Sequence, residues 1–131
     1  MNGAGGLHAG SPHLPYQAQI EAYGNGGFRF GGMSHRGSIL CLPAGVWAWP
    51  VEAPQQIDDV ALRLLTEASG SLDFILLGTG KDFWQPPAHV RLRFRDMGVS
   101  LDAMPTGPAV RTYNVMLAES RRVGAGLIAV D

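Results

Sequence analysis

Apolar residues in the first part of the chain fall in short segments separated by turns. These segments predict strands at 20–23, 28–30, 38–42 and 46–49, before Pro50. Phe28-Arg29-Phe30 alternates apolar and polar side chains, as a half-buried strand does. The turn Gly24-Asn25-Gly26-Gly27 is rich in residues that tolerate positive φ and predicts a hairpin. This part of the chain therefore predicts an antiparallel β layer.

The apolar period changes to that of a helix after the proline-containing linker 51–56. A predicted helix over 57–69 has apolar side chains at helical spacing, namely Ile57, Val60, Ala61, Leu64, Leu65 and Ala68. Asp58 and Asp59 fall in its first turn, where the helix dipole favours carboxylates, and Gly70 follows as a C-cap. Capping explains these adjacent acids better than acid–base catalysis.

The rest of the chain alternates strands and helices. Strands are predicted at 72–77, 99–104 and 123–130, with helices near 86–97 and 107–121. Residues 90–95 fit either a strand, by alternation of apolar residues with arginines, or a helix, by the spacing of Val90, Phe94 and Met97. A crossover between two adjacent parallel strands needs about a dozen residues, which favours the helix. The three arginines are then expected on a solvated surface.

These elements predict one α/β domain over 20–131, preceded by a disordered tail over 1–19. Gly124 and Gly126 in the closing strand allow close approach of another layer. Trp47 and Trp49 point the same way on their strand, and packing between layers is favoured over ligand stacking.

Composition narrows the class of protein. The net charge is −1, so nucleic acid is not expected as a partner. No apolar run approaches the roughly 18 residues of a membrane span, and no signal or transit pattern is seen. A soluble cytoplasmic protein is expected, with an already removed presequence left open. Homo-oligomerisation is also left open.

The thiol and imidazole groups predict no metal site or cofactor. The single cysteine, Cys41, lies in an apolar run and is expected to be a buried structural thiol. The four histidines (His8, His13, His35 and His89) and Cys41 do not fall at metal-ligand spacing.

Known catalytic patterns do not fit the chain. Gly78-Thr79-Gly80-Lys81 resembles part of a phosphate loop, but Ile75 stands where the Walker pattern needs a glycine. Phe83 stands where a dinucleotide fingerprint needs its third glycine. No catalytic residue is assigned, and the chain is expected to be a non-enzyme more than an enzyme.

Two turns follow strands predicted to be parallel and should meet in a crevice. They contribute Gly78, Thr79, Gly80, Lys81, Thr106, Gly107 and Arg111. Unpaired N–H groups at the start of the second helix, with Lys81 and Arg111, would suit an anion. The alternative is structural: Thr106 caps its helix, the charges are solvated or paired, and the glycines serve tight turns. Both remain open at this point.

The loop after the 72–77 strand carries two large aromatic residues, Phe83 and Trp84. Aromatics in a loop can anchor a protein partner. The alternative, held equally, is that both fold back under the loop as a small apolar cluster.

Several segments resemble the Mth938-like family, whose members are domains of unknown function. They are Gly78–Lys81, Gly98-Val99, residues 104–123, and the hairpin 26–32 followed by 38–43. The family includes a mitochondrial factor that assists assembly of respiratory complex I and an adipogenesis-associated protein. The resemblance spans roughly residues 20–130, and Phe83-Trp84 departs from the more polar loop of the family.

The resemblance implies a single three-layer α/β domain, with a mixed central sheet, helices and an N-terminal antiparallel β-hairpin layer. It supplies no established catalytic residues. It favours a non-enzymatic binding or assembly module with a protein partner. The alternative is a small-molecule binder or enzyme that uses the crevice for an anionic ligand.

Overall fold

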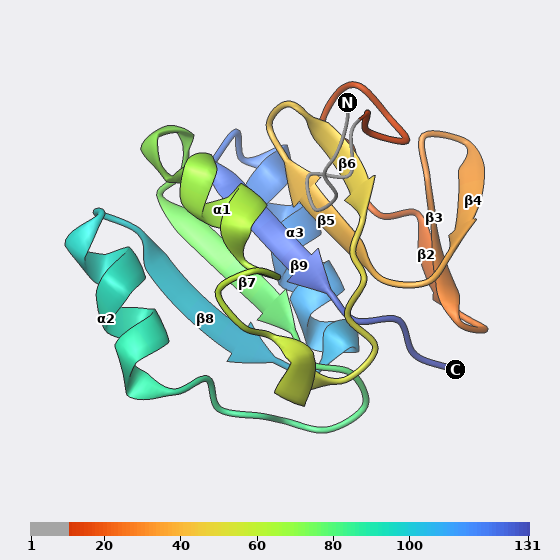
Figure 1. Ribbon diagram of the computed structural model, residues 1–131. Coiled ribbons are helices and arrows are strands. Elements are labelled where there is room, and N and C mark those ends of the chain that lie inside the picture. The colour runs from red at the N-terminus through yellow and green to blue at the C-terminus, as the bar shows by residue number, and fades with distance from the viewer. Residues whose placement is uncertain (1–10) are drawn as a thin grey trace.

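The computed structural model describes residues 11–131, which form two β-sheets and three α-helices (Figure 1). The strands are β2 (Ala22–Gly24), β3 (Gly27–Phe30), β4 (Met33–Arg36), β5 (Ile39–Leu42), β6 (Gly45–Ala48), β7 (Phe74–Gly78), β8 (Ser100–Met104) and β9 (Val123–Leu127). The helices are α1 (Arg63–Glu67), α2 (Ala88–Asp96) and α3 (Thr106–Ala118), with short 3-10 turns at Pro54–Gln56 and Ser69–Ser71.

The central sheet has five strands in the order β6-β5-β9-β7-β8. β7 pairs in parallel with β8 on one side and with β9 on the other, whereas β5 runs antiparallel to both β9 and β6. The sheet is therefore mixed, as predicted. The neighbouring parallel strands β7 and β8 are joined by α2, which confirms the helix at the ambiguous segment 90–95.

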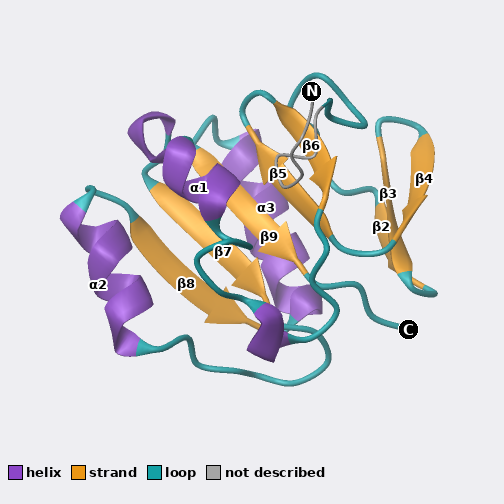
Figure 2. Cartoon of the chain, in the orientation of Figure 1, coloured by secondary structure: helices purple, strands orange, loops and turns teal. Residues whose placement is uncertain are grey.

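Two apolar clusters cover the two faces of this sheet. One contains side chains of α1, α2 and the linker before α1, among them Val51, Leu65, Val90 and Phe94. The other contains side chains of α3 and the β2–β3–β4 sheet, among them Phe30, Val110 and Tyr113. Figure 2 shows α3 behind the central sheet and the smaller sheet beside β6. The three-layer expectation is confirmed.

The smaller sheet is antiparallel throughout, in the order β2-β3-β4. Asn25 and Gly26 form the turn between β2 and β3, with φ of 52° and 79°. Two consecutive positive φ angles are what the favoured two-residue hairpin turn requires. The Gly-Asn-Gly-Gly sequence thus sets the register of the hairpin layer.

The predicted helix over 57–69 is too long. The structure has turns from 59 to 62, and α1 begins at Arg63. Asp58 does cap this segment, since its Oδ1 accepts a hydrogen bond from the Ala61 N–H at 2.9 Å. The Ala61 carbonyl, which would accept from residue 65 in a regular helix, is taken by the Trp49 indole N–H at 2.9 Å. A contact from the segment that follows β6 therefore takes up a carbonyl that the predicted helix would use.

The predicted tail over 1–19 also needs correction where the structure describes it. Leu14 is buried and forms an isolated antiparallel bridge with Val46 of β6. The Gln17 amide donates to the Val123 carbonyl at 2.7 Å, and the Ala18 carbonyl accepts from the Tyr113 hydroxyl at 2.8 Å. Residues 14–18 thus pack on the sheet. Residues 1–10, with His8, lie outside the described part.

Both glycines of β9 lie where another layer approaches closely. A Cβ on Gly126 would stand 2.8 Å from the Trp49 ring, and one on Gly124 would stand 3.1 Å from Leu72. Trp49 is buried, and Trp47 packs against the same cluster. The packing interpretation of both tryptophans and both glycines is confirmed. None of the described helices is long and apolar enough to cross a membrane.

We predict that Gly126→Ala lowers the free energy of unfolding by about 1–3 kcal/mol, because the new methyl group overlaps the Trp49 ring in a filled core. Urea denaturation followed by circular dichroism measures this. Gly70→Ala is the matched control, since no atom lies within 4 Å of its Cβ position. Equal stability of the two variants would contradict the packing argument.

Candidate functional site

The two predicted turns do meet at the carboxyl ends of β7 and β8. Gly78 and Met104 are paired residues at these ends, and the Thr79 N–H donates to the Met104 carbonyl at 2.9 Å. The Thr106 N–H, at the start of α3, donates to the Gly80 carbonyl at 2.9 Å. The two turns are therefore joined by hydrogen bonds into a junction, and Thr79 and Gly80 also line a groove of about 310 Å³.

Thr106 is the centre of this junction. Its side chain is fully buried, and its hydroxyl donates to the Ile128 carbonyl at 2.7 Å while accepting from the Gly80 N–H at 3.0 Å. One hydroxyl thus joins the segments that follow β7, β8 and β9. Gly78 makes room for it, because a Cβ there would stand 3.0 Å from the Thr106 hydroxyl oxygen.

Thr79 is also committed to the turn. Its hydroxyl lies 2.6 Å from the Asp82 carbonyl and 3.2 Å from that of Met104. A hydroxyl has one proton, so the shorter contact is the principal hydrogen bond. Gly80 has a φ of +97°, which accounts for glycine at that position. Gly78, Thr79 and Gly80 are all buried, and they hold the backbone of the turn in place.

The two charged residues of the predicted crevice face different neighbours. Lys81 lies 3.7 Å from Asp131, and both side chains are largely exposed, so this ion pair is weak. Lys81 lines a groove of about 310 Å³ that also holds Glu52, Asp82 and Asp131. Three carboxylates beside one ammonium group make this groove a poor place for an anion.

Arg111 lies instead beside the first turn of α3. A Cβ on Gly107 would stand 3.8 Å from its Nη1 and 2.7 Å from the Tyr23 hydroxyl. Tyr23 belongs to β2, and no sequence pattern indicated that the hairpin reaches this helix terminus. In the first turn the Thr106 N–H is already used and Pro108 has none, which leaves the Gly107 N–H.

The loop between β7 and α2, residues 79–87, carries two adjacent aromatic residues that differ in burial. Trp84 is half-buried and packs against the cluster that contains Val90 and Phe94. Phe83 is 57% exposed. One aromatic thus fastens the loop, and its neighbour presents an apolar ring to solvent. We call residues 79–87 the Phe83 loop.

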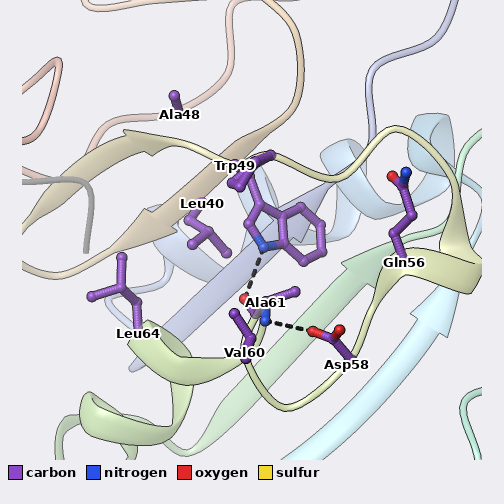
Figure 3. Close-up of a pocket in the computed structure, with 9 residues that line it drawn as sticks. Leu40, Ala48, Trp49, Gln56, Asp58, Val60, Ala61 and Leu64 are labelled. Atoms are coloured by element: carbon purple, nitrogen blue, oxygen red, sulfur yellow. Dashed lines mark hydrogen bonds between the residues drawn. The ribbon is translucent and has the colours of Figure 1, made fainter. Parts of the chain in front are cut away.

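A separate cleft of about 310 Å³ opens between the end of β6 and the segment before α1 (Figure 3). Nine residues line it, namely Leu40, Ala48, Trp49, Pro50, Gln56, Asp58, Val60, Ala61 and Leu64. Asp58 is its one ionisable side chain, and it caps Ala61, as the dashed line in Figure 3 shows. Gln56 accepts from the Glu52 N–H at 2.5 Å. The cleft has an apolar wall and no acid–base pair.

Burial changes the pKa of two further side chains, Cys41 and His35. Burial raises the pKa of the Cys41 thiol to about 12, so the reactive thiolate is scarce at neutral pH. Burial, and then the neighbouring His13 ring, lower the pKa of His35 from its ordinary value. Within residues 11–131 no three His, Cys, Asp or Glu side chains gather closely enough to hold a metal ion.

Comparison with known families assigns this fold to a group. Residues 20–128 match the family described as protein of unknown function (DUF498/DUF598). The chain belongs to this family. A Bordetella pertussis Mth938-like domain solved by NMR has a TM-score of 0.72 and 28% identity, over 86% of this chain and 85% of that one. The family membership confirms the resemblance to Mth938-like domains.

Two further family relatives differ in what their names say. One is known from a crystal structure described as that of an outer membrane protein from Bartonella henselae. Its sequence is 44% identical and its TM-score is 0.86, over 91% of this chain and 100% of that one. The NADH dehydrogenase [ubiquinone] 1 alpha subcomplex assembly factor 3 of Bos taurus is 28% identical over 87% of this chain. The match spans 62% of that relative's length.

We predict that Thr106→Val destabilises the fold, because it leaves the Ile128 carbonyl and the Gly80 N–H buried without a partner. Each such group costs roughly 1–3 kcal/mol, and valine keeps the shape of threonine. Thermal and urea denaturation measure the loss. Thr112→Val is the control, since that hydroxyl makes only a 3.7 Å contact with the Met104 sulfur. A stable Thr106→Val protein would show that the junction does not depend on this hydroxyl.

Proposed function

We propose that this protein is a non-catalytic, cytoplasmic protein-binding module that acts as an assembly factor. The observation that carries the proposal is the exposed Phe83 ring on a loop fastened by Trp84. An aromatic held in place loses little conformational freedom on binding, which is the usual character of an interface anchor.

Two other observations support a binding role. At the carboxyl ends of the parallel strands, where α/β proteins commonly hold ligands, the hydroxyls of Thr79 and Thr106 are taken up by main-chain hydrogen bonds. The family relative from Bos taurus is named as an assembly factor. A partner protein is the class of ligand that both observations favour.

We predict that Phe83→Ala abolishes capture of the partner while leaving the fold intact. Loss of a buried aromatic anchor costs about 2 kcal/mol or more, which corresponds to at least a tenfold weaker complex. Pull-down of tagged protein from lysate of the encoding organism, followed by titration of the captured partner, measures the change. The free energy of unfolding should stay within about 0.5 kcal/mol, as for other surface substitutions.

Val115→Ala is the matched control for this test. Val115 is 56% exposed and belongs to α3 on the other face of the sheet, so its truncation removes exposed apolar surface away from the Phe83 loop. The proposal fails if no protein is captured reproducibly, or if both variants retain the partner equally.

A second candidate function is binding of an anion at the start of α3. Its support is that the Arg111 guanidinium and the Tyr23 hydroxyl both lie close to Gly107 in the first turn of α3. These donors differ from the predicted set, since Lys81 lies in the acidic groove. Helix termini carry partial positive charge and bind phosphate or carboxylate groups through such donors.

We predict that inorganic phosphate at millimolar concentration shifts the amide resonances of residues 106–111 in ¹⁵N-labelled protein. Arg111→Gln should weaken the response several-fold, because it removes the only full positive charge of this group. Lys81→Gln should leave the response unchanged. If no amide of 106–111 moves, these residues serve the junction alone.

A further inference from the structure

β8, the strand at one border of the central sheet, has one free edge. β8 pairs with β7, and no other described strand pairs with it. Figure 2 shows β8 at the border of the sheet with α2 alongside. An edge strand offers unpaired N–H and C=O groups to another chain unless the protein blocks them.

The hydrogen bonds of β8 identify which groups are free. The Ser100 N–H donates to Asp73 at 3.0 Å, and the Met104 carbonyl accepts from Thr79 at 2.9 Å. Main-chain groups alternate in direction along a strand, so even-numbered residues of β8 face β7. The N–H and C=O groups of Leu101 and Ala103 therefore point away from the sheet.

This edge borders a groove of about 480 Å³. One wall is α2, which contributes Ala88, Arg91, Leu92 and Arg95, and the other is residues 99–102. Leu92 is 49% exposed, although it is apolar. The nine residues of α2 span about 13 Å, the length of roughly four residues of extended chain. The groove thus has the dimensions of a short strand.

The charges of the groove select what enters it. Arg93 is paired with Asp59 at 2.8 Å, but Arg91 and Arg95 form no ion pair within residues 11–131. The Arg91 Nε is buried and has no hydrogen-bond partner among the described residues. Asp102, the one acidic residue of the groove, is exposed and belongs to β8. Its side chain and that of its neighbour Leu101 point to opposite sides of the strand. The α2 wall, with Arg91 and Arg95, is basic.

We propose that the β8 edge and the α2 wall bind an extended acidic segment of a protein partner by adding it as a sixth strand. This inference rests on the proposed binding function and names the surface and the chemistry of the partner. The Leu101 and Ala103 main chain would pair with the segment. Arg91 and Arg95 would meet its carboxylates, and Leu92 would cover an apolar side chain.

A second copy of this chain fits the edge less well. Antiparallel pairing of two β8 edges would place both α2 helices on the same face of the joined sheet. Arg91 and Arg95 of the two copies would then face their own counterparts, and like charges at an interface disfavour it. An acidic segment has the complementary charge instead.

A phage-displayed library of random twelve-residue peptides tests the proposal. Selection should enrich peptides that alternate Asp or Glu with apolar residues. An enriched peptide, made synthetically, should shift the amide resonances of Leu101, Ala103 and α2 in ¹⁵N-labelled protein. Enrichment of basic peptides, no enrichment, or shifts confined to another surface would overturn the proposal.

Two variants and one control separate strand addition from general attraction. Arg91→Glu with Arg95→Glu should weaken the selected peptide at least tenfold. Ala103→Pro removes an outward N–H, which edge strands tolerate, and should weaken it similarly. Arg63→Glu changes an exposed arginine on α1 and should leave affinity unchanged. Thermal denaturation verifies the fold of each variant, and the charge variants carry the test if the proline variant unfolds. Equal weakening by Arg63→Glu would overturn the proposal.

The outcome is distinguishable from that of the proposed function. If Phe83→Ala abolishes partner capture but the edge variants do not, the edge proposal fails and the binding function stands. If peptides bind the edge but lysate yields no partner, the edge proposal stands and the proposed function fails. If concentrated protein pairs with itself through Leu101 and Ala103, seen as concentration-dependent amide shifts, a second copy is the occupant and the proposal is wrong.

Discussion

The structure depends on one buried hydroxyl. Thr106 accepts from the Gly80 N–H and donates to the Ile128 carbonyl, so it joins the segments that leave β7, β8 and β9. Water does not reach this position, because the side chain is fully buried. The polar main chain at three strand ends is therefore satisfied from within the protein, and Gly78 must lack a side chain to admit the hydroxyl.

The same junction takes up space at one end of the sheet. In open α/β sheets the carboxyl ends of parallel strands commonly form the ligand crevice. Here the same end is filled by hydrogen bonds of the turns, and the adjacent groove is acidic. The Phe83 loop and the β8 edge both flank the same helix, α2. Both suit a polypeptide better than a metabolite.

The sequence predicted those parts of the fold that depend on local periodicity and on strand connection. The hairpin with Asn25-Gly26, the parallel pair β7 and β8, and helix α2 followed from such patterns. The errors came from contacts between distant segments. The Trp49 indole donates a hydrogen bond to the Ala61 carbonyl where the predicted helix is missing. Leu14, a residue of the predicted tail, pairs with Val46 of β6. Periodicity carries no information about such partners.

The candidate site shows the same limit at the level of single residues. Phe83 and Trp84 are adjacent and chemically alike, so no pattern separates an anchor of the loop from an exposed ring. The division depends on the apolar cluster beneath the loop, against which Trp84 packs and to which Val90 and Phe94 of α2 also belong. The Phe83 loop and the helix that forms the basic wall thereby rest on the same apolar cluster. A partner that binds both surfaces meets one preorganised unit, which reduces the entropy lost on binding.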